Sequence, residues 1–347
     1  MQDAPLPVYE STRLIGLELE YDSGSTVFRS PENIPNWPAK YDGSLNNGRE
    51  FVLEPAVAYN ELMPHVKTFC DAFDPIKIGL TSRGGYHVHV QVGDYTHTHA
   101  YRLARIYTHF QEVINQLLAK SRANNRFCPP FQLDELTQAS LVDEFDLDRL
   151  STTRAEAKGS RAYRTVNFAM MRCQNPQLRS VEFRQGSPSK RFSNIYGWAT
   201  LTVALTEMAI NDQTYTLSTQ LNPDLEGFLT LLNHWEGQVC AKNLVKWVQW
   251  RHEIMNHAPT PEMVTQLLAY LALGSRGLFS IATHLDINYP TATRLLEYAL
   301  RMQDSQVERV GNRYRLTRVS DDLPQEDVAR LLRAAQLREE NEAVATA

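Results

Sequence analysis

The sequence has few of the features that mark membrane, secreted or zinc-knuckle proteins. Only four cysteines occur in 347 residues, and no two have the CxxC spacing of a zinc knuckle or a redox pair. The apolar run at 197–210 is shorter than the roughly 18 residues of a membrane span and contains Glu207. Residues 1–7 lack a basic start followed by an apolar stretch, so nothing resembles a secretory signal. We therefore expect a cytoplasmic protein without a membrane segment.

Several ready-made nucleotide sites are also missing. The sequence has no Walker loop, no kinase glycine-rich loop and no internal repeat. Hydrophobic residues make up 43% and charged residues 22%, a balance that excludes a disordered or coiled-coil chain. A net charge of -5 argues against a surface uniformly suited to nucleic acid, although it leaves room for a local basic face.

The pattern predicts an α+β domain over residues 1–245. Apolar residues recur at three and four positions in 100–118, which predicts an amphipathic helix. The segment 193–210 is apolar nearly all round, so we expect a buried helix beneath a sheet. Residues 131–157 are polar and acidic, and we interpret them as an insertion or a flexible lid.

Two predicted strands alternate apolar side chains with acidic or imidazole ones. Glu18 and Glu20 share one face of the first strand, with leucines on the other, and His87 and His89 share one face of a later strand that follows two glycines. Two carboxylates on one face repel each other unless water or a cation neutralises them. The pairs therefore indicate either a solvated strand face or a set of metal ligands.

Two further segments add charged groups of the same kind. Glu182 and Arg184 share a strand face, and Asp42 and Glu50 flank a turn rich in glycine and asparagine. A common sheet would gather all these side chains in one concave site. Carboxylates with a single imidazole suit Mg²⁺ or Mn²⁺, and an arginine beside them suits phosphate oxygens. This combination favours phosphoryl transfer, in which positioning and electrostatic stabilisation do most of the work.

Five segments resemble, in order, those of the amidoligase family of carboxylate-amine ligases. They are GLELE, DGSL followed by GREFV, GGYHVHV, RAYRTVNF and VEFRQGS, and the likeness covers roughly residues 13–210. The resemblance implies a glutamine-synthetase-like antiparallel sheet with flanking helices. It also implies ATP- and Mg²⁺-dependent amide bond formation between a carboxylate and an amine substrate, through an acyl phosphate.

The resemblance also implies roles for particular residues. The implied ligands of Mg²⁺, or of Mn²⁺ in its place, are Glu18, Glu20, Glu50, His87 and Glu182. The implied ATP-binding residues are Arg184, Arg161, Arg164 and His89, and the implied catalytic residues are Arg184, Asp42 and Arg164.

His89 would touch substrate or phosphate if it does not bind metal. Glu54 stands where the family has a small polar residue, so either Glu50 or Glu54 could be the third carboxylate; we favour Glu50. An exposed basic pair at Arg161 and Arg164, and a turn-forming Asp42, are the alternative interpretations.

The C-terminal part predicts a helical linker and a winged helix-turn-helix over residues 246–318. Helices are expected at 280–285 and 290–302, followed by a hairpin that turns at Gly311 and Asn312. This region has nine basic and six acidic residues, which indicates a nucleic-acid or protein partner. Residues 319–347 read as an acidic tail that is helical or disordered.

Two other functions fit parts of these patterns. An HxH pair with carboxylates also suits a metal-dependent hydrolase, which would act without ATP. A winged helix behind a nucleotide-binding domain also suits a DNA-binding regulator, which would form no ligase product.

Overall fold

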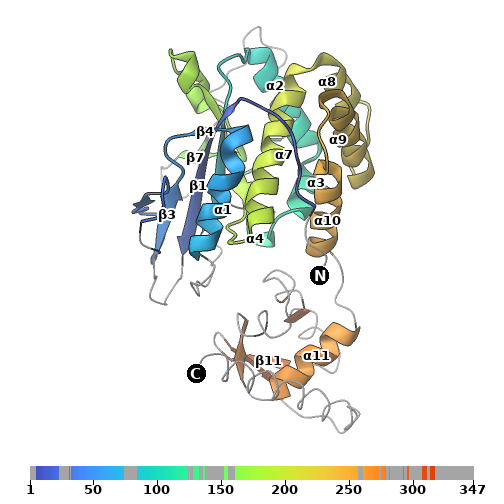
Figure 1. The fold of residues 1–347 in the computed structure, drawn as a ribbon. Helices are drawn as coiled ribbons and strands as arrows, with labels where there is room; N and C mark the ends of the chain where they lie inside the picture. Colours follow the sequence, from blue (N-terminus) through green and yellow to red (C-terminus); the bar gives the residue numbers. More distant parts are fainter. Residues whose placement is uncertain are drawn as a thin grey trace. The chain divides into compact units, whose positions relative to one another are not determined.

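The computed structural model divides the chain into two compact units, Met1–Glu253 and Ile254–Ala347 (Figure 1). The residues that the structure describes are 5–22, 31, 33–73, 84–123, 125, 128–132, 136, 152–154, 161–256, 261–272, 275–278, 281, 292, 295–296, 307–310 and 313–316. The fold is α+β with a mostly antiparallel sheet. Most of the predicted insertion at 131–157 and all of the tail at 319–347 lie outside the described residues.

A seven-stranded sheet forms the centre of the first unit. Its strands are β1 (Leu14–Asp22), β2 (Ala39–Lys40), β3 (Gly48–Val52), β4 (Val57–Ala58), β5 (Tyr86–Gln91), β8 (Val166–Asn167) and β9 (Ser180–Gly186). They are ordered β2-β3-β1-β5-β9-β8, and β4 pairs with β1. All these pairings are antiparallel. A separate two-stranded sheet joins β6 (Thr152–Arg154) to β7 (Arg161–Tyr163).

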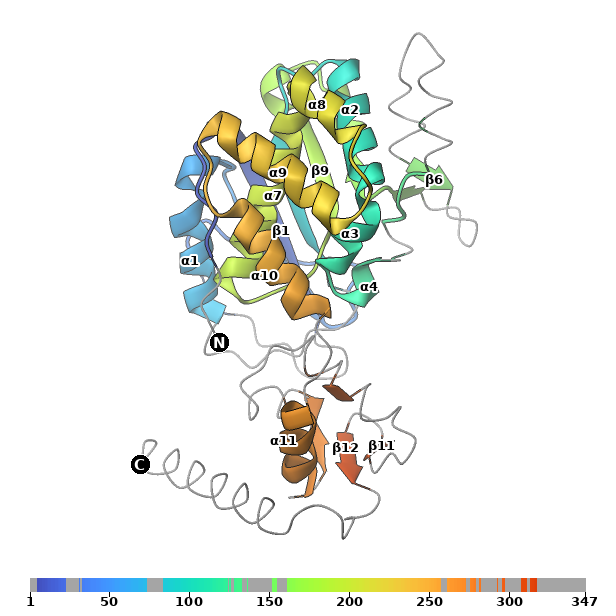
Figure 2. The ribbon, with the colours of Figure 1, turned by 90° about the vertical axis from the view of Figure 1, so that its right-hand side faces the viewer.

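Helices cover one face of the sheet in two layers. They are α1 (Leu62–Phe73), α2 (His97–His109), α3 (Gln111–Gln116), α4 (Lys120–Ala123), α7 (Phe192–Ile210), α8 (Asp212–Ser218), α9 (Leu225–Val239) and α10 (Leu244–Asn256). The 3-10 helices are η1 (Tyr59–Glu61), η2 (Ala169–Arg172) and η3 (Pro176–Leu178). Helices α1, α2 and α7 pack on the sheet, and α9 and α10 lie over the outer side of α7 (Figures 1 and 2). Polar side chains of the opposite sheet face remain available to form a site.

Helix α7 confirms the buried helix predicted at 193–210. Its threonines Thr200, Thr202 and Thr206 are fully buried, and each hydroxyl donates a hydrogen bond to a carbonyl oxygen three or four residues earlier in the helix. These bonds satisfy the hydroxyl groups within the apolar core. Among the described residues, no helix is both long and apolar enough to traverse a lipid bilayer.

The helix predicted over 100–118 is interrupted in the structure. Phe110 has φ -101° and ψ 16°, outside the helical region, so α2 and α3 are separate helices. The Phe110 ring is fully buried and lies 5.1 Å from the ring of Phe228 between centroids. Apolar residues keep the same period on both sides of the interruption, so the sequence pattern gives no sign of it.

Helix α10 packs in the first unit, although the predicted linker begins at residue 246. The Trp247 indole Nε1 donates a hydrogen bond of 2.9 Å to the carbonyl oxygen of Ser193 in α7. The Arg251 guanidinium Nε donates one of 2.9 Å to the carbonyl oxygen of Leu117. The division between the units therefore lies nearer the end of this helix than its start.

The second unit contains α11 (Pro261–Ala272) and a three-stranded antiparallel sheet. The strands β10 (Arg276–Gly277), β11 (Val307–Val310) and β12 (Arg313–Leu316) are ordered β10-β12-β11. The predicted hairpin is confirmed, with Val310 paired to Arg313. A separate core includes Leu267 and Ile281. The helices predicted at 280–285 and 290–302 lie mostly outside the described residues.

Candidate metal centre

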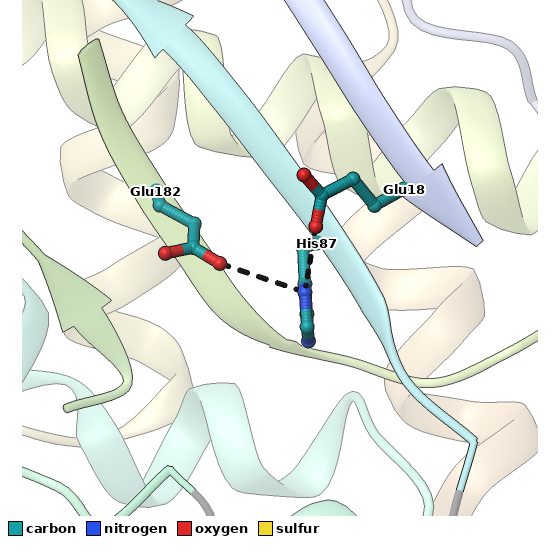
Figure 3. A group of neighbouring side chains, drawn as sticks. All are labelled: Glu18, His87 and Glu182. Atoms are coloured by element: carbon teal, nitrogen blue, oxygen red, sulfur yellow. Dashed lines mark hydrogen bonds and ion pairs between the residues drawn. The ribbon is translucent and has the colours of Figure 1, made fainter. Parts of the chain in front are cut away.

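Three strands bring Glu18, His87 and Glu182 together on the sheet face opposite the helices (Figure 3). Glu18 of β1 faces His87 of β5 in the strand register, and β9 carries Glu182 on the other side of β5. The His87 Nδ1 atom lies 3.2 Å from Glu18 Oε2 and 3.5 Å from Glu182 Oε1. One ligand atom from each residue lies within 4.8 Å of the other two. This spacing is short enough for one ion to contact all three.

A second group of Glu20, Asp42 and Glu50 adjoins the first. Glu20 faces Glu50 across β1 and β3, and Asp42 reaches the pair from the turn before β3. Their ligand oxygens also lie within 4.8 Å of one another. Glu54 is instead half exposed and ion-paired with Lys40, so the geometry favours Glu50 as the carboxylate of this group. His87 Nε2 lies 3.7 Å from Glu20 Oε1, and its ring therefore stands between the two groups.

The negative charge of the second group is only partly compensated by the nearby His87. Burial, together with the neighbouring charges of Glu18, Glu20 and Asp42, raises the pKa of Glu50 to about 7. Like charges at this distance favour the protonated form of one of them. A bound divalent cation would remove this repulsion, which is why such clusters serve as cation ligands.

The first group is closer to neutral because histidines and an arginine lie among its carboxylates. Burial acts to raise the pKa of Glu18, but the contacts of this carboxylate with His87 and His89 outweigh it and hold this pKa well below its usual range. Burial likewise opposes a lower pKa for Glu182, yet His87 and Arg184 lower it. Both carboxylates are therefore ionised at neutral pH.

His89 lies beside the first group. Its Nε2 atom is 3.0 Å from Glu18 Oε1 and 4.0 Å from Glu182 Oε1. Burial acts to lower the pKa of His89, but its interactions with Glu18 and Glu182 raise it above the ordinary value. The structure thus places the second histidine of the HxH pair where it can contact a metal or an anion bound to one.

The three predicted arginines have different positions. Arg184 lies at the site, where its Nη1 donates a hydrogen bond to Glu182 Oε1. Arg164 is buried: its Nη1 donates a hydrogen bond of 2.7 Å to the Pro130 carbonyl oxygen, and its guanidinium lies 5.4 Å from the centroid of the Phe131 ring. Its role at the site stays a prediction. The side chain of Arg161 lies outside the described part of the chain.

Two residues of the site were not singled out from the sequence. Asn167 of β8 donates a hydrogen bond of 2.8 Å from Nδ2 to Glu182 Oε2, which orients that carboxylate. A Cβ atom on Gly85 would lie only 2.7 Å from Glu20 Oε2 and 3.1 Å from His87 Nε2. A side chain at Gly85 would displace one of them. The glycine pair before the HxH segment was the available signal for this close approach.

The donor atoms fit a hard divalent cation. Oxygen ligands predominate in both groups, and the second group is entirely carboxylate. Mg²⁺ and Mn²⁺ prefer such oxygen ligands, whereas zinc typically binds nitrogen and sulfur. Arg184 adds a donor for phosphate oxygens at the edge of the first group.

No family model and no curated protein matches this chain.

Proposed function

We propose that this protein is an ATP- and Mg²⁺-dependent carboxylate-amine ligase of the amidoligase type. The observation that carries the proposal is the pair of adjoining ligand groups on one face of an antiparallel sheet, with Arg184 beside them. A single metal-binding group would suit many proteins. Two groups bridged by His87 suit a nucleotide whose phosphates contact more than one cation. The five motifs that resemble amidoligases support the same assignment.

In this proposal the chain's own residues bind the cations and orient the nucleotide. Glu18, His87 and Glu182 would hold one Mg²⁺, and Glu20, Asp42 and Glu50 would hold another. Bound Mg²⁺ would supply neutralisation of phosphate charge as the phosphoryl group moves.

Arg184 would donate hydrogen bonds to phosphate oxygens, and His89, which lies beside the same carboxylates, would add a second donor. Asp42 would also be placed to orient the amine. The product is an amide formed through an acyl phosphate.

Calorimetric titration with ATP tests the proposal directly. We expect ATP to bind the full-length protein at least about tenfold more tightly with Mg²⁺ than without it, a difference of about 1.4 kcal/mol. Glu18→Ala should remove this Mg²⁺ dependence because it removes a ligand of the first group. Absence of ATP binding with either Mg²⁺ or Mn²⁺ would contradict the proposal. Hydrolytic activity that needs metal but no ATP would instead support the hydrolase alternative.

We also propose that the second unit is a winged helix-turn-helix that contacts nucleic-acid phosphates. Its three-stranded sheet exposes Arg313 and Arg315 on one face of β12. Arg313 also donates a hydrogen bond of 2.7 Å to the Ser275 carbonyl oxygen, which steadies its side chain. Exposed arginines on a hairpin are suited to the backbone of a duplex.

A salt titration of duplex binding by the full chain tests this second proposal. The double variant Arg313→Gln, Arg315→Gln is expected to bind more weakly than wild type, with a shallower dependence of log K on log salt by up to about 1.8, since each phosphate contact contributes about 0.9. Glu308→Gln is a control on the paired strand and should not weaken binding. Absence of duplex binding by wild type at low salt would refute the proposal and leave a protein partner for this unit.

A further inference from the structure

Strand β9 contains an extra residue directly beside the candidate metal centre. The pairing of β5 with β9 shifts between Tyr86 and Val88, so His87 alone faces both Arg184 and Gln185. Two residues opposite one define a β-bulge. Bulges turn the side chains of the strand that carries them and are frequent next to active sites. Here the bulge contains the arginine of the site and faces one of its metal-ligand candidates.

The side chain of Gln185 points away from the site into a buried polar network. It is fully buried, and its Oε1 accepts hydrogen bonds of 2.9 Å from Tyr107 Oη and of 2.9 Å from Gln111 Nε2. Its Nε2 donates one of 2.6 Å to Asn115 Oδ1 and one of 3.2 Å to the carbonyl oxygen of Arg122. A glutamine amide has two acceptor and two donor positions, so this one is fully used.

The backbone of Arg184 is fixed from both sides. Its N–H donates a hydrogen bond of 2.9 Å to the Thr165 carbonyl oxygen. Its own carbonyl oxygen accepts a hydrogen bond from Nη2 of Arg122, whose side chain is 3% exposed. The same Arg122 therefore touches the bulge twice, through its guanidinium at Arg184 and through its carbonyl at Gln185.

We infer that Gln185, supported by Arg122, is a positioning residue that holds the Arg184 guanidinium beside Glu182. This inference rests on the proposed function, in which Arg184 contacts phosphate. The amide of Gln185 uses all four of its hydrogen-bonding positions, so any shift of this side chain leaves a buried donor or acceptor without its partner. An apolar side chain could fill the same space but would not fix the extra residue of β9 in one register. The network thus gives the bulge a single geometry.

A double-mutant cycle on the full-length protein tests the inference. Gln185→Met keeps the side-chain length and removes all four hydrogen bonds. We expect it to weaken ATP binding in the presence of Mg²⁺ by about tenfold, while the affinity for Mn²⁺ alone changes by less than about twofold. In the Arg184→Gln background the same substitution should cause no further loss of ATP affinity, because the positioned group is already gone.

A milder variant keeps the test valid if Gln185→Met fails to fold. Tyr107→Phe removes one hydrogen bond to Gln185 and leaves the ring in place, so we expect a loss of about twofold to threefold in ATP affinity, again only when Arg184 is present. Equal losses with and without Arg184 would show that Gln185 acts only on the fold and would overturn the inference. Unchanged ATP affinity in folded Gln185→Met would also overturn it. If wild type itself does not bind ATP, the proposed function fails first and the inference falls with it.

Discussion

Replacing Glu182 by glutamine is expected to lower the affinity for Mn²⁺ by more than about 100-fold and to abolish ATP turnover. Loss of a residue that only orients a metal ligand already costs about 10- to 100-fold, and Glu182 is itself a candidate ligand. Its carboxylate is ionised because His87 and Arg184 lower its pKa despite burial. The neutral amide keeps the shape of the side chain but removes the charge that attracts the cation. Electron paramagnetic resonance of free Mn²⁺ would measure the affinity.

Glu54→Gln is the matched control for this variant. It makes the same chemical change on a carboxylate that is half exposed and paired with Lys40 outside both ligand groups. We expect its Mn²⁺ affinity to stay within about twofold of wild type, as for exposed ion pairs of small energy. Similar losses in Glu54→Gln and Glu182→Gln would mean that Mn²⁺ responds to overall charge and would contradict the assigned ligand group.

Trp247→Ala is expected to destabilise the first unit by about 3–5 kcal/mol, the cost of truncating a large buried aromatic residue. Trp247 is 1% exposed and lies so close to Gly197 that a Cβ atom there would be 2.1 Å from the ring. Its indole also donates a hydrogen bond to Ser193. Truncation would open a cavity between α7 and α10 and remove that hydrogen bond. Hydrogen exchange of the α7 amides would measure the loss.

Trp250→Ala on the same helix provides the comparison. Trp250 is only half-buried, so its removal should cost distinctly less than removal of Trp247. If the free energy of opening measured by hydrogen exchange of the α7 amides stays within about 1 kcal/mol of wild type in Trp247→Ala, the packing of Trp247 does not contribute to the stability of the first unit.

The sequence predicted which side of each main helix or strand is buried more readily than it predicted which elements pack against that side. Alternation in 14–21 predicted that Leu17 and Leu19 face the core, and both are fully buried. The apolar character of 193–210 predicted a buried helix in the same way. The interruption at Phe110 and the packing of α10 had no such signal. Both depend on contacts with residues far away in the sequence, whereas periodicity reports only which side of an element is apolar.

In the candidate site, too, the sequence predicted which residues share a face of one strand, but not which residues lie opposite each other on neighbouring strands. Alternation placed Glu18 with Glu20 and His87 with His89, and the structure adds the register that sets Glu18 against His87. The contribution of Asn167 depends on its pairing opposite Glu182, which one sequence does not reveal. The contact of Arg164 with Pro130 was hidden for the same reason, since it joins residues 34 positions apart in the chain.

Strand β1 contributes to both ligand groups and pairs with strands on both its sides. Glu18 and Glu20 are separated by one leucine, so inserting or deleting a residue between them would send one carboxylate into the apolar core. Leu14, which is 38% exposed near the start of the strand, is under no such restriction. The length of strand β1 between Glu18 and Glu20 therefore sets the separation of the two ligand groups, and in the proposed function it would set the separation of the two cations as well.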